Sequence, residues 1–173
     1  MCERLIAEHP GSGETGAFLV WGDPALYDSV IAVVDDVLAR GTTGFDVRVV
    51  PGISIISALA ARHRTTVDQV SVAVRITTGR RPARGWPECV DDVLVVLDSR
   101  DAFPGFVDEP GVTVHWGACV GTPDEILIAG PLPEVADRII EARERARAAK
   151  GWIMDSYLLR RPAGRSTAPN TSA

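Results

Sequence analysis

AFLVWGDPALYDS, residues 17–29, is the stretch from which the fold is best predicted. Its first five residues are apolar and predict a strand that is buried on both faces, as in a parallel sheet. Gly22 allows a sharp turn or the close approach of a ligand to the backbone, and Pro24 suits the first turn of a helix. Because open α/β sheets bind ligands beyond the carboxyl ends of their strands, this stretch predicts a ligand-binding edge.

The composition is that of an ordinary soluble globular protein. The chain has 173 residues, a formal net charge of -5, 46% hydrophobic residues and 24% charged residues, which suits one large domain or two small ones. The acidic balance argues against a nucleic-acid partner, and no apolar stretch reaches the ~20 residues of a membrane span. The three cysteines are far apart and predict neither a disulfide framework nor a metal site, so we expect a cytoplasmic protein.

Hydrophobic periodicity predicts strands that alternate with helices in the first half, and mainly strands in the second half. Helices are expected over residues 2–9, 25–40, 54–63 and 133–150. Strands are expected over residues 17–21, 46–50, 71–78, 93–97, 112–116, 125–129 and 152–159. The Glu- and Arg-rich outer face of the last helix is predicted to be solvated, and residues 162–173 to be disordered.

GSGETG, residues 11–16, fits the G-x-G-x-x-G pattern of dinucleotide-binding loops. That loop must follow a strand and open a helix, whereas this stretch precedes the strand at residues 17–21. We therefore interpret it as an ordinary loop.

Three segments together resemble the tetrapyrrole methylase family, whose members transfer a methyl group from S-adenosylmethionine to a porphyrin-like ring. WGDPALYDS at 21–29 resembles the family's Gly-Asp-Pro loop, and VVPGISIISALAARH at 49–63 resembles its Pro-Gly-Ile/Val-Ser/Thr-Ser segment. GACVGTPDEILIAGPLPEVADRI at 117–139 resembles its Gly-Thr loop with the strand and helix that follow. The resemblance implies a two-domain α/β fold: the remainder of a truncated first domain at 1–66, a second domain with a mixed sheet at 67–161, and a tail at 162–173.

The resemblance also implies an activity. ITTGRR at 76–81 and GWIMDSYLLRR at 151–161 resemble those members that methylate a corrin precursor, precorrin-5, at C-1 and release acetate. The methyl carbon of a sulfonium is already electrophilic, so positioning supplies much of the catalysis. Family members usually form homodimers and bind the cofactor between two α/β domains. Relatives that modify ribosomal RNA or diphthamide are the alternative, although the net charge disfavours RNA.

Position by position, the resemblance assigns cofactor contacts to strand ends and loops. These are Gly22, Asp23, Pro24, Tyr27, Ser54, Ile55, Leu97, Asp98, Gly117, Ala118, Gly121 and Thr122. Ile55 departs from the usual Ser, so a contact there would come from its backbone. Arg80 and Arg81 are expected to bind the substrate's carboxylates, which guanidinium groups recognise bidentately. The catalytic acid or base stays unassigned, and no metal is expected.

Several of these residues have a structural interpretation as well. Asp23 and Ser54 stand at predicted helix starts, where either is a favoured N-cap. Asp98 and Asp101 can form a catalytic carboxylate pair, or they can be solvent-exposed side chains of a loop. His63 is expected at the surface or at a helix end, and His115 is expected to be packed or hydrogen-bonded on a strand. The histidines and cysteines lack the spacing of metal ligands.

The main departure from the family is at the start of the sequence. The family begins with a strand and a loop of the form Gly-x-Gly-x-Gly-Asp-Pro-x-x-Leu-Thr, and nothing here resembles it. By the resemblance, we expect about the first third of the enzyme to be absent. Two alternatives follow: a working methyltransferase with a reduced first domain, or an inactive or cofactor-binding-only remnant.

Overall fold

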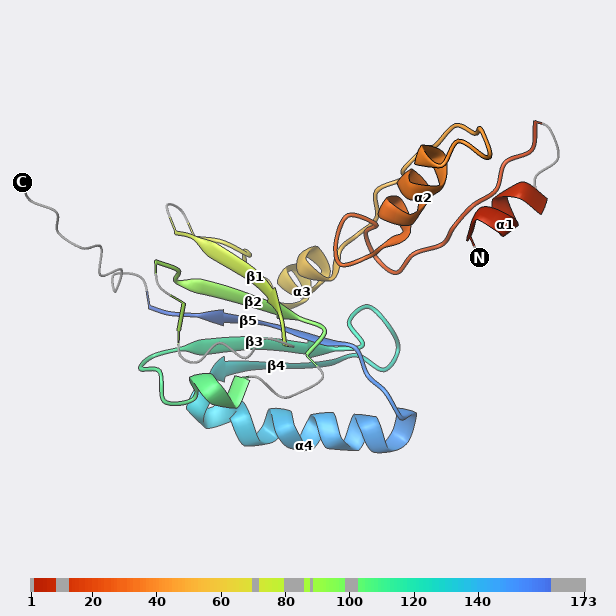
Figure 1. The fold of residues 1–173 in the computed structure, drawn as a ribbon. Coiled ribbons are helices and arrows are strands. Elements are labelled where there is room, and N and C mark those ends of the chain that lie inside the picture. Colours follow the sequence, from red (N-terminus) through yellow and green to blue (C-terminus); the bar gives the residue numbers. More distant parts are fainter. Residues whose placement is uncertain are drawn as a thin grey trace, which may run out of the picture. The chain divides into compact units, whose positions relative to one another are not determined.

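The computed structural model describes residues 2–8, 13–69, 72–79, 86–87, 89–98 and 103–162. Arg80, Arg81, Asp101 and the predicted disordered tail from 163 onwards lie outside the described residues. The chain divides into two compact units, residues 1–55 and 56–173, which Figure 1 draws as ribbons. No helix among the described residues is long and apolar enough to cross a membrane.

Helices and strands together confirm the α/β class. The helices are α1 (Cys2–Glu8), α2 (Val30–Ala39), α3 (Ile55–His63), the short 3-10 helix η1 (Phe103–Phe106) and α4 (Leu132–Lys150). The strands are β1 (Val74–Thr78), β2 (Asp92–Val96), β3 (Thr113–Ala118), β4 (Ile126–Pro131) and β5 (Asp155–Arg160).

All five strands belong to one mixed sheet in the second unit, in the order β1-β2-β5-β3-β4. β1 and β2 are parallel, and the other neighbouring pairs are antiparallel. Because β2 and β3 both run antiparallel to β5, they run parallel to each other. Ser156 of β5 pairs with Val96 on one side and Gly117 on the other, so β2 and β3 end at the same edge. The predicted cofactor segments at 97–98 and 117–122 therefore share one edge of the sheet.

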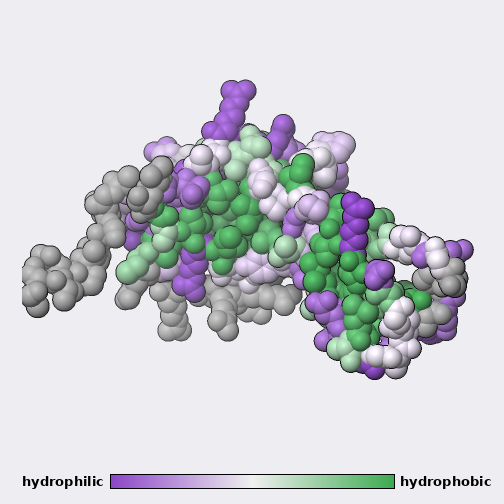
Figure 2. Space-filling view, turned by 90° about the horizontal axis from the view of Figure 1, so that it is seen from above, coloured by the Kyte–Doolittle hydropathy of each residue, from purple (hydrophilic) through white to green (hydrophobic). Residues whose placement is uncertain are grey.

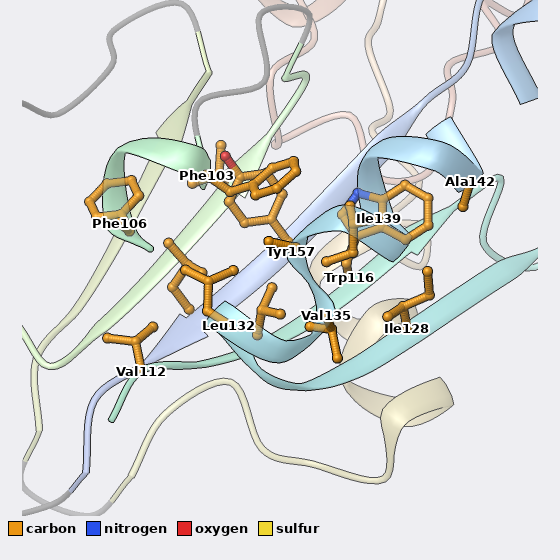
Figure 3. Close-up of a cluster of buried hydrophobic side chains, with 14 of the residues drawn as sticks. Phe103, Phe106, Val112, Trp116, Ile128, Leu132, Val135, Ile139, Ala142 and Tyr157 are labelled. Atoms are coloured by element: carbon orange, nitrogen blue, oxygen red, sulfur yellow. The ribbon is translucent and has the colours of Figure 1, made fainter. Parts of the chain in front are cut away.

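The main core lies between the sheet and α4, which runs along one face together with η1 (Figure 1). Trp116 of β3, Tyr157 of β5 and Ile139 of α4 are fully buried there (Figure 3). The ring of Phe103 meets that of Tyr157 edge to face, with centroids 5.9 Å apart. On the opposite face of the sheet, the buried Leu59 of α3 packs against Gly117 of β3.

The predicted strands at 17–21 and 46–50 are wrong as sheet elements, because neither segment belongs to a sheet. Both segments remain largely exposed, including Leu19 and Val50. A strand is stabilised by its neighbours' hydrogen bonds and by packing on its faces, and the first unit of the structure supplies neither. The apolar pattern was correct for an extended segment but not sufficient to give a sheet.

The helix predicted from residue 25 begins only at Val30. Tyr27 has φ +55°, a left-handed conformation that no α-helix accommodates. The carboxylate of Asp28 then accepts a hydrogen bond of 2.6 Å from the backbone N–H of Val30. The helix start is therefore set by Asp28, and Asp23 does not cap it.

We expect replacement of Ile139 by alanine to destabilise the second unit. The side chain is fully buried in the α4 core, and such truncations cost about 2–5 kcal/mol of unfolding free energy. Urea-induced unfolding measures the loss. Arg138→Ala, at an exposed position of the same helix, is the control and should change the unfolding free energy by less than about 0.5 kcal/mol. Equal losses for the two variants would contradict the packing described for α4.

Candidate functional site

In the first unit, the carboxylate of Asp23 joins two loops. Its Oδ1 accepts a hydrogen bond of 2.8 Å from the backbone N–H of Ala25, and its Oδ2 accepts one of 3.0 Å from the backbone N–H of Gly52. The Asp23 carboxylate thus holds its own loop and also the segment that contains Gly52. Asp23 is a loop-bridging residue, which its position in the sequence alone did not reveal.

Two glycines let these loops approach each other closely. A Cβ atom on Gly52 would collide with the carbonyl oxygen of Gly22. Gly22 itself adopts φ +77°, a conformation that favours glycine. A Cβ on Gly22 would lie 3.2 Å from the carbonyl oxygen of Ile53 and 3.9 Å from the Cα of Ser54. The structure therefore brings together the predicted cofactor residues at 22–24 and 54–55, within the first unit.

In the second unit, β2 is followed by a strained residue and then by a buried one. Leu97 has φ +54° and is 41% exposed, whereas Asp98 is 2% exposed. The Tyr157 hydroxyl donates a hydrogen bond of 2.8 Å to Oδ2 of Asp98, and Arg143 donates one to the Asp98 carbonyl oxygen. Gly79 packs so closely on Asp98 that any Cβ there would collide with its carboxylate. The Asp98 side chain therefore points into the protein, which argues against its being part of a solvated loop.

Arg143 and Asp155 form an ion pair beneath this strand end, with each side chain 2% exposed. Nε of Arg143 lies 2.7 Å from Oδ2 of Asp155, and the indole N–H of Trp116 donates to the same carboxylate at 3.1 Å. Burial raises the pKa of Asp155 from 3.8 to about 6, although Arg143 acts in the opposite direction. Burial and the neighbouring Asp98 carboxylate also raise the pKa of Tyr157 well above its usual value, so the phenol stays a proton donor.

The loop after β3 is held by its own hydrogen bonds. The Thr122 hydroxyl donates to the carbonyl oxygen of Cys119 at 2.8 Å, and the Gly121 N–H donates to Glu125 at 2.9 Å. Arg62 of α3 binds Glu125 through Nε at 2.8 and 2.9 Å, and this hydrogen bonding lowers the pKa of Glu125. Gly121 and Thr122 are exposed to solvent.

Gly117 and Ala118 are placed differently, inside the sheet. Ala118 is fully buried in the α4 core. On the other face, a Cβ on Gly117 would lie 2.7 Å from a methyl carbon of Leu59 and 2.7 Å from one of Val120. Gly117 makes room for α3, and this packing is a structural reason for a glycine at a predicted cofactor position.

The two histidines of the second unit pack as expected. His63 ends α3 and its Nε2 lies 3.0 Å from the carbonyl oxygen of Trp116. Its ring meets that of His115 edge to face, with centroids 5.4 Å apart. Burial lowers the pKa of both imidazoles. In the described part of the chain, no group of three or more His, Cys, Asp or Glu side chains is arranged to hold a metal ion.

Sequence reasoning missed Arg143, Tyr157 and Asp155. The outer face of the helix at 133–150 was expected to be solvated, and Arg143 is an exception because it is 1% exposed. A signal existed: Arg143 follows Ile139 by four residues, so it lies on the apolar stripe of the helix. A charged residue on such a stripe predicts a buried partner of opposite charge.

The chain belongs to the tetrapyrrole (corrin/porphyrin) methylase family, whose model matches residues 1–136. It is 50% identical over 161 residues to precorrin-6A synthase [deacetylating] of Sinorhizobium sp.. The match covers 93% of this chain and 61% of that enzyme, so the chain spans about three-fifths of the relative's length.

Solved structures agree with this family. A protein of Corynebacterium diphtheriae described as cobalamin synthesis related (CobF) is 32% identical, with a TM-score of 0.81 over 92% of this chain and 68% of that chain. Uroporphyrin-III C-methyl transferase of Thermus thermophilus, complexed with S-adenyl homocysteine, is 18% identical with a TM-score of 0.50 over 80% of this chain and 62% of that chain. The second likeness shows the fold alone.

We expect Gly52→Ala to open the bridge between the two loops of the first unit. The added methyl group would collide with the Gly22 carbonyl, and overpacking of this kind costs about 1–3 kcal/mol. Hydrogen exchange of the Ala25 and Gly52 amides should then accelerate at least about fivefold. Gly44→Ala is the matched control, because nothing lies within 4 Å of its added Cβ. Unchanged exchange in Gly52→Ala would contradict the close approach.

We expect Asp155 to make stability depend on pH in an unusual direction. Its pKa is about 6 in the folded chain and is taken as the ordinary 3.8 in the unfolded chain, so the folded state holds the proton more tightly. The contribution of Asp155 to stability therefore falls by roughly 3 kcal/mol as the pH rises from about 4 to about 6, and is constant above that.

The measurement is urea unfolding of the parent chain and of Asp155→Asn across this pH range. The difference, parent minus variant, should decrease towards pH 6. Replacement of the exposed Asp137 by asparagine controls for the loss of a carboxylate. A difference that increases with pH would mean that the charge of Arg143 outweighs burial.

Proposed function

We propose that this chain acts in the S-adenosylmethionine-dependent methylation of precorrin-5 at C-1, which gives precorrin-6A and acetate. The observation that carries the proposal is the 50% identity, over 93% of the chain, to an enzyme named precorrin-6A synthase [deacetylating]. The alternative that we keep is a chain that binds the cofactor without turnover, because it spans 61% of that enzyme's length.

The described residues fit S-adenosylmethionine as a cofactor held mainly by backbone groups. Most predicted contacts are Gly, Ala, Pro, Leu or Ile, which have no polar side chain and offer only backbone groups for hydrogen bonds. Strained backbone supports this use, because Tyr27 and Leu97 have φ +55° and +54° at predicted contact positions. When bound, the cofactor supplies a methyl group on a sulfonium, which needs positioning more than activation.

Asp23 takes the part of a positioning residue in this proposal. Both carboxylate oxygens accept backbone hydrogen bonds, so the group is already engaged in holding the loops at 22–25 and 52. Asp98 is similarly engaged by Tyr157 and Arg143, behind the exposed Leu97. Each carboxylate therefore shapes, within its own unit, the backbone at predicted cofactor contacts.

The substrate part of the proposal rests on Arg80 and Arg81. They directly follow Gly79, which closes the parallel strand β1 at the edge where β2 also ends. A corrin precursor carries several carboxylates, and guanidinium forks match them. Activity as a cytoplasmic homodimer, without nucleic-acid or membrane partners, is the remaining part of the proposal. The homodimer is supported by the resemblance alone, whereas the net charge, the short apolar stretches and the cysteine usage support the rest.

The first test is isothermal titration of the purified chain with S-adenosylhomocysteine, followed by assay of precorrin-5 methylation and acetate release. We expect saturable binding at one site and measurable turnover. Binding without turnover would favour the cofactor-binding-only alternative. A folded chain that does not bind would contradict both functions.

A matched pair of glycine variants locates the binding site. Gly121 and Gly151 have φ +81° and +79°, and nothing lies within 4 Å of a Cβ added to either. Alanine at each position therefore imposes a similar strain of about 1 kcal/mol. We expect Gly121→Ala to weaken S-adenosylhomocysteine binding at least tenfold and Gly151→Ala to leave it unchanged. Equal effects would remove the loop at 119–125 from the site.

A further inference from the structure

Two helices of the second unit anchor the loop at 119–125 through ion pairs. Glu125 is paired with Arg62 of α3, whose Nε lies 2.8 and 2.9 Å from the two carboxylate oxygens. Asp124 is paired with Lys150, the last residue of α4. The loop includes two predicted cofactor contacts, so its conformation there is set partly by residues of the two helices.

The Arg62–Glu125 pair extends to one of these predicted contacts, Gly121. Oε2 of Glu125 accepts a hydrogen bond of 2.9 Å from the backbone N–H of Gly121. Because Arg62 contacts both carboxylate oxygens, it fixes the orientation of the carboxylate and hence the direction of this acceptor. Hydrogen bonding to Arg62 also lowers the pKa of Glu125, which keeps the acceptor ionised. Arg62 therefore acts on Gly121 through Glu125.

The geometry of Arg62 separates it from an ordinary surface arginine. Hydrophilic side chains, in purple, are scattered over the face of the molecule shown in Figure 2, so exposure alone indicates no role. The Arg62 side chain is 57% exposed, but that of Glu125 is only 11% exposed. Most exposed ion pairs contribute little to stability, unless a guanidinium contacts both oxygens of a carboxylate, as it does here.

The backbone of Arg62 is held on the sheet. Leu59, almost one turn earlier in α3, is 2% exposed and packs on Gly117 of β3. His63, the next residue, has its Nε2 3.0 Å from the carbonyl oxygen of Trp116, also in β3. These contacts lie on either side of Arg62 in the sequence. They fix its backbone relative to β3, the strand from which the loop departs.

The loop itself has little packing to hold it at Gly121. This residue has φ +81°, and none of the described residues beyond its chain neighbours comes within 4 Å of a Cβ added to it. A glycine without packing partners has many accessible conformations, and a ligand that binds it must restrict them. A hydrogen bond that restricts Gly121 beforehand lowers this entropic cost of binding and so raises the affinity.

We propose that Arg62 is a positioning residue for the cofactor, because it holds Glu125 and thereby presets the loop at 119–125. This role rests on the proposed function, since it takes Gly121 and Thr122 as cofactor contacts. The loop is held in the same way before and during methyl transfer. Arg62 therefore contributes to cofactor binding and leaves the chemical step unchanged.

The test compares Arg62→Ala with the parent chain, by isothermal titration with S-adenosylhomocysteine and by steady-state methylation of precorrin-5. We expect the dissociation constant and the KM for S-adenosylmethionine to rise at least about fivefold, with kcat within about twofold of the parent. Hydrogen exchange of the Gly121 amide should accelerate at least about fivefold, whereas exchange in β5 should not change.

Two further variants separate the fork from the charge. Arg62→Lys keeps the positive charge without the planar fork, so it should restore binding only in part. Arg145→Ala is the matched control, because it removes an arginine and its exposed ion pair with Glu141 but leaves Glu125 intact. We expect this control to bind S-adenosylhomocysteine like the parent.

A double-mutant cycle with Glu125→Ala tests the route from Arg62 to the loop. Glu125→Ala also removes the acceptor for Gly121, so it should weaken binding at least as much as Arg62→Ala. If Arg62 acts through Glu125, combining the two changes should weaken binding by less than about twofold beyond Glu125→Ala alone. Urea unfolding verifies that each variant is folded.

Four outcomes would overturn the role of Arg62 while the proposed function stands. These are unchanged affinity of Arg62→Ala, equal effects of Arg62→Ala and Arg145→Ala, additive losses in the cycle, and a loss confined to kcat. If the parent binds without turnover, the titrations and the cycle decide alone. A folded parent that does not bind S-adenosylhomocysteine would instead contradict the proposed function, and the role of Arg62 with it.

Discussion

The ion pair between Arg143 and Asp155 is the constraint on which the second unit depends. Desolvating the two charges costs several kcal/mol each, so they are kept only where further hydrogen bonds compensate them. Trp116 donates to Asp155, and Arg143 also donates to the Asp98 carbonyl oxygen. These partners come from α4, β5, β3 and the end of β2. A shift of any one of these elements would leave a charge buried without compensation, so their ends are fixed relative to one another.

The first unit is organised on a different principle. Its described core is small, with Val34 and Val37 as the buried apolar residues of α2. The loop geometry instead depends on backbone groups that meet without intervening side chains, at Gly22 and Gly52. Each hydrogen bond from a backbone N–H to the Asp23 carboxylate adds about 1.5–3 kcal/mol. Positions 22 and 52 therefore require glycine for steric reasons. Among the loop arrangements that the glycines allow, the Asp23 carboxylate stabilises the observed one.

The elements predicted best are those that local pattern and burial favour together. The helix at 133–150 and the strands at 93–97 and 112–116 are confirmed to within two residues, because each contributes several apolar residues to the core between the sheet and α4. The insertion of β5 between β2 and β3 was not predictable, since strand order depends on long-range pairing. The segments 17–21 and 46–50 show the reverse case. Their pattern is typical of buried strands, but a sheet also needs a neighbour to pair with.

Prediction also failed where the backbone is strained, and that failure is informative. The sequence from Ala25 onwards favours a helix, yet Tyr27 adopts φ +55°, and Leu97 ends a buried strand at φ +54°. Such conformations cost about 1–3 kcal/mol and persist only where the surroundings enforce them.

For Leu97 the enforcing contacts are those of the next residue, Asp98, which Tyr157 and Arg143 hold in the interior. A loop without a function has no reason to keep that cost, because relaxing it would stabilise the chain. We infer that the buried polar network supports one exposed strand end, whose backbone N–H and C=O groups would be available to a ligand.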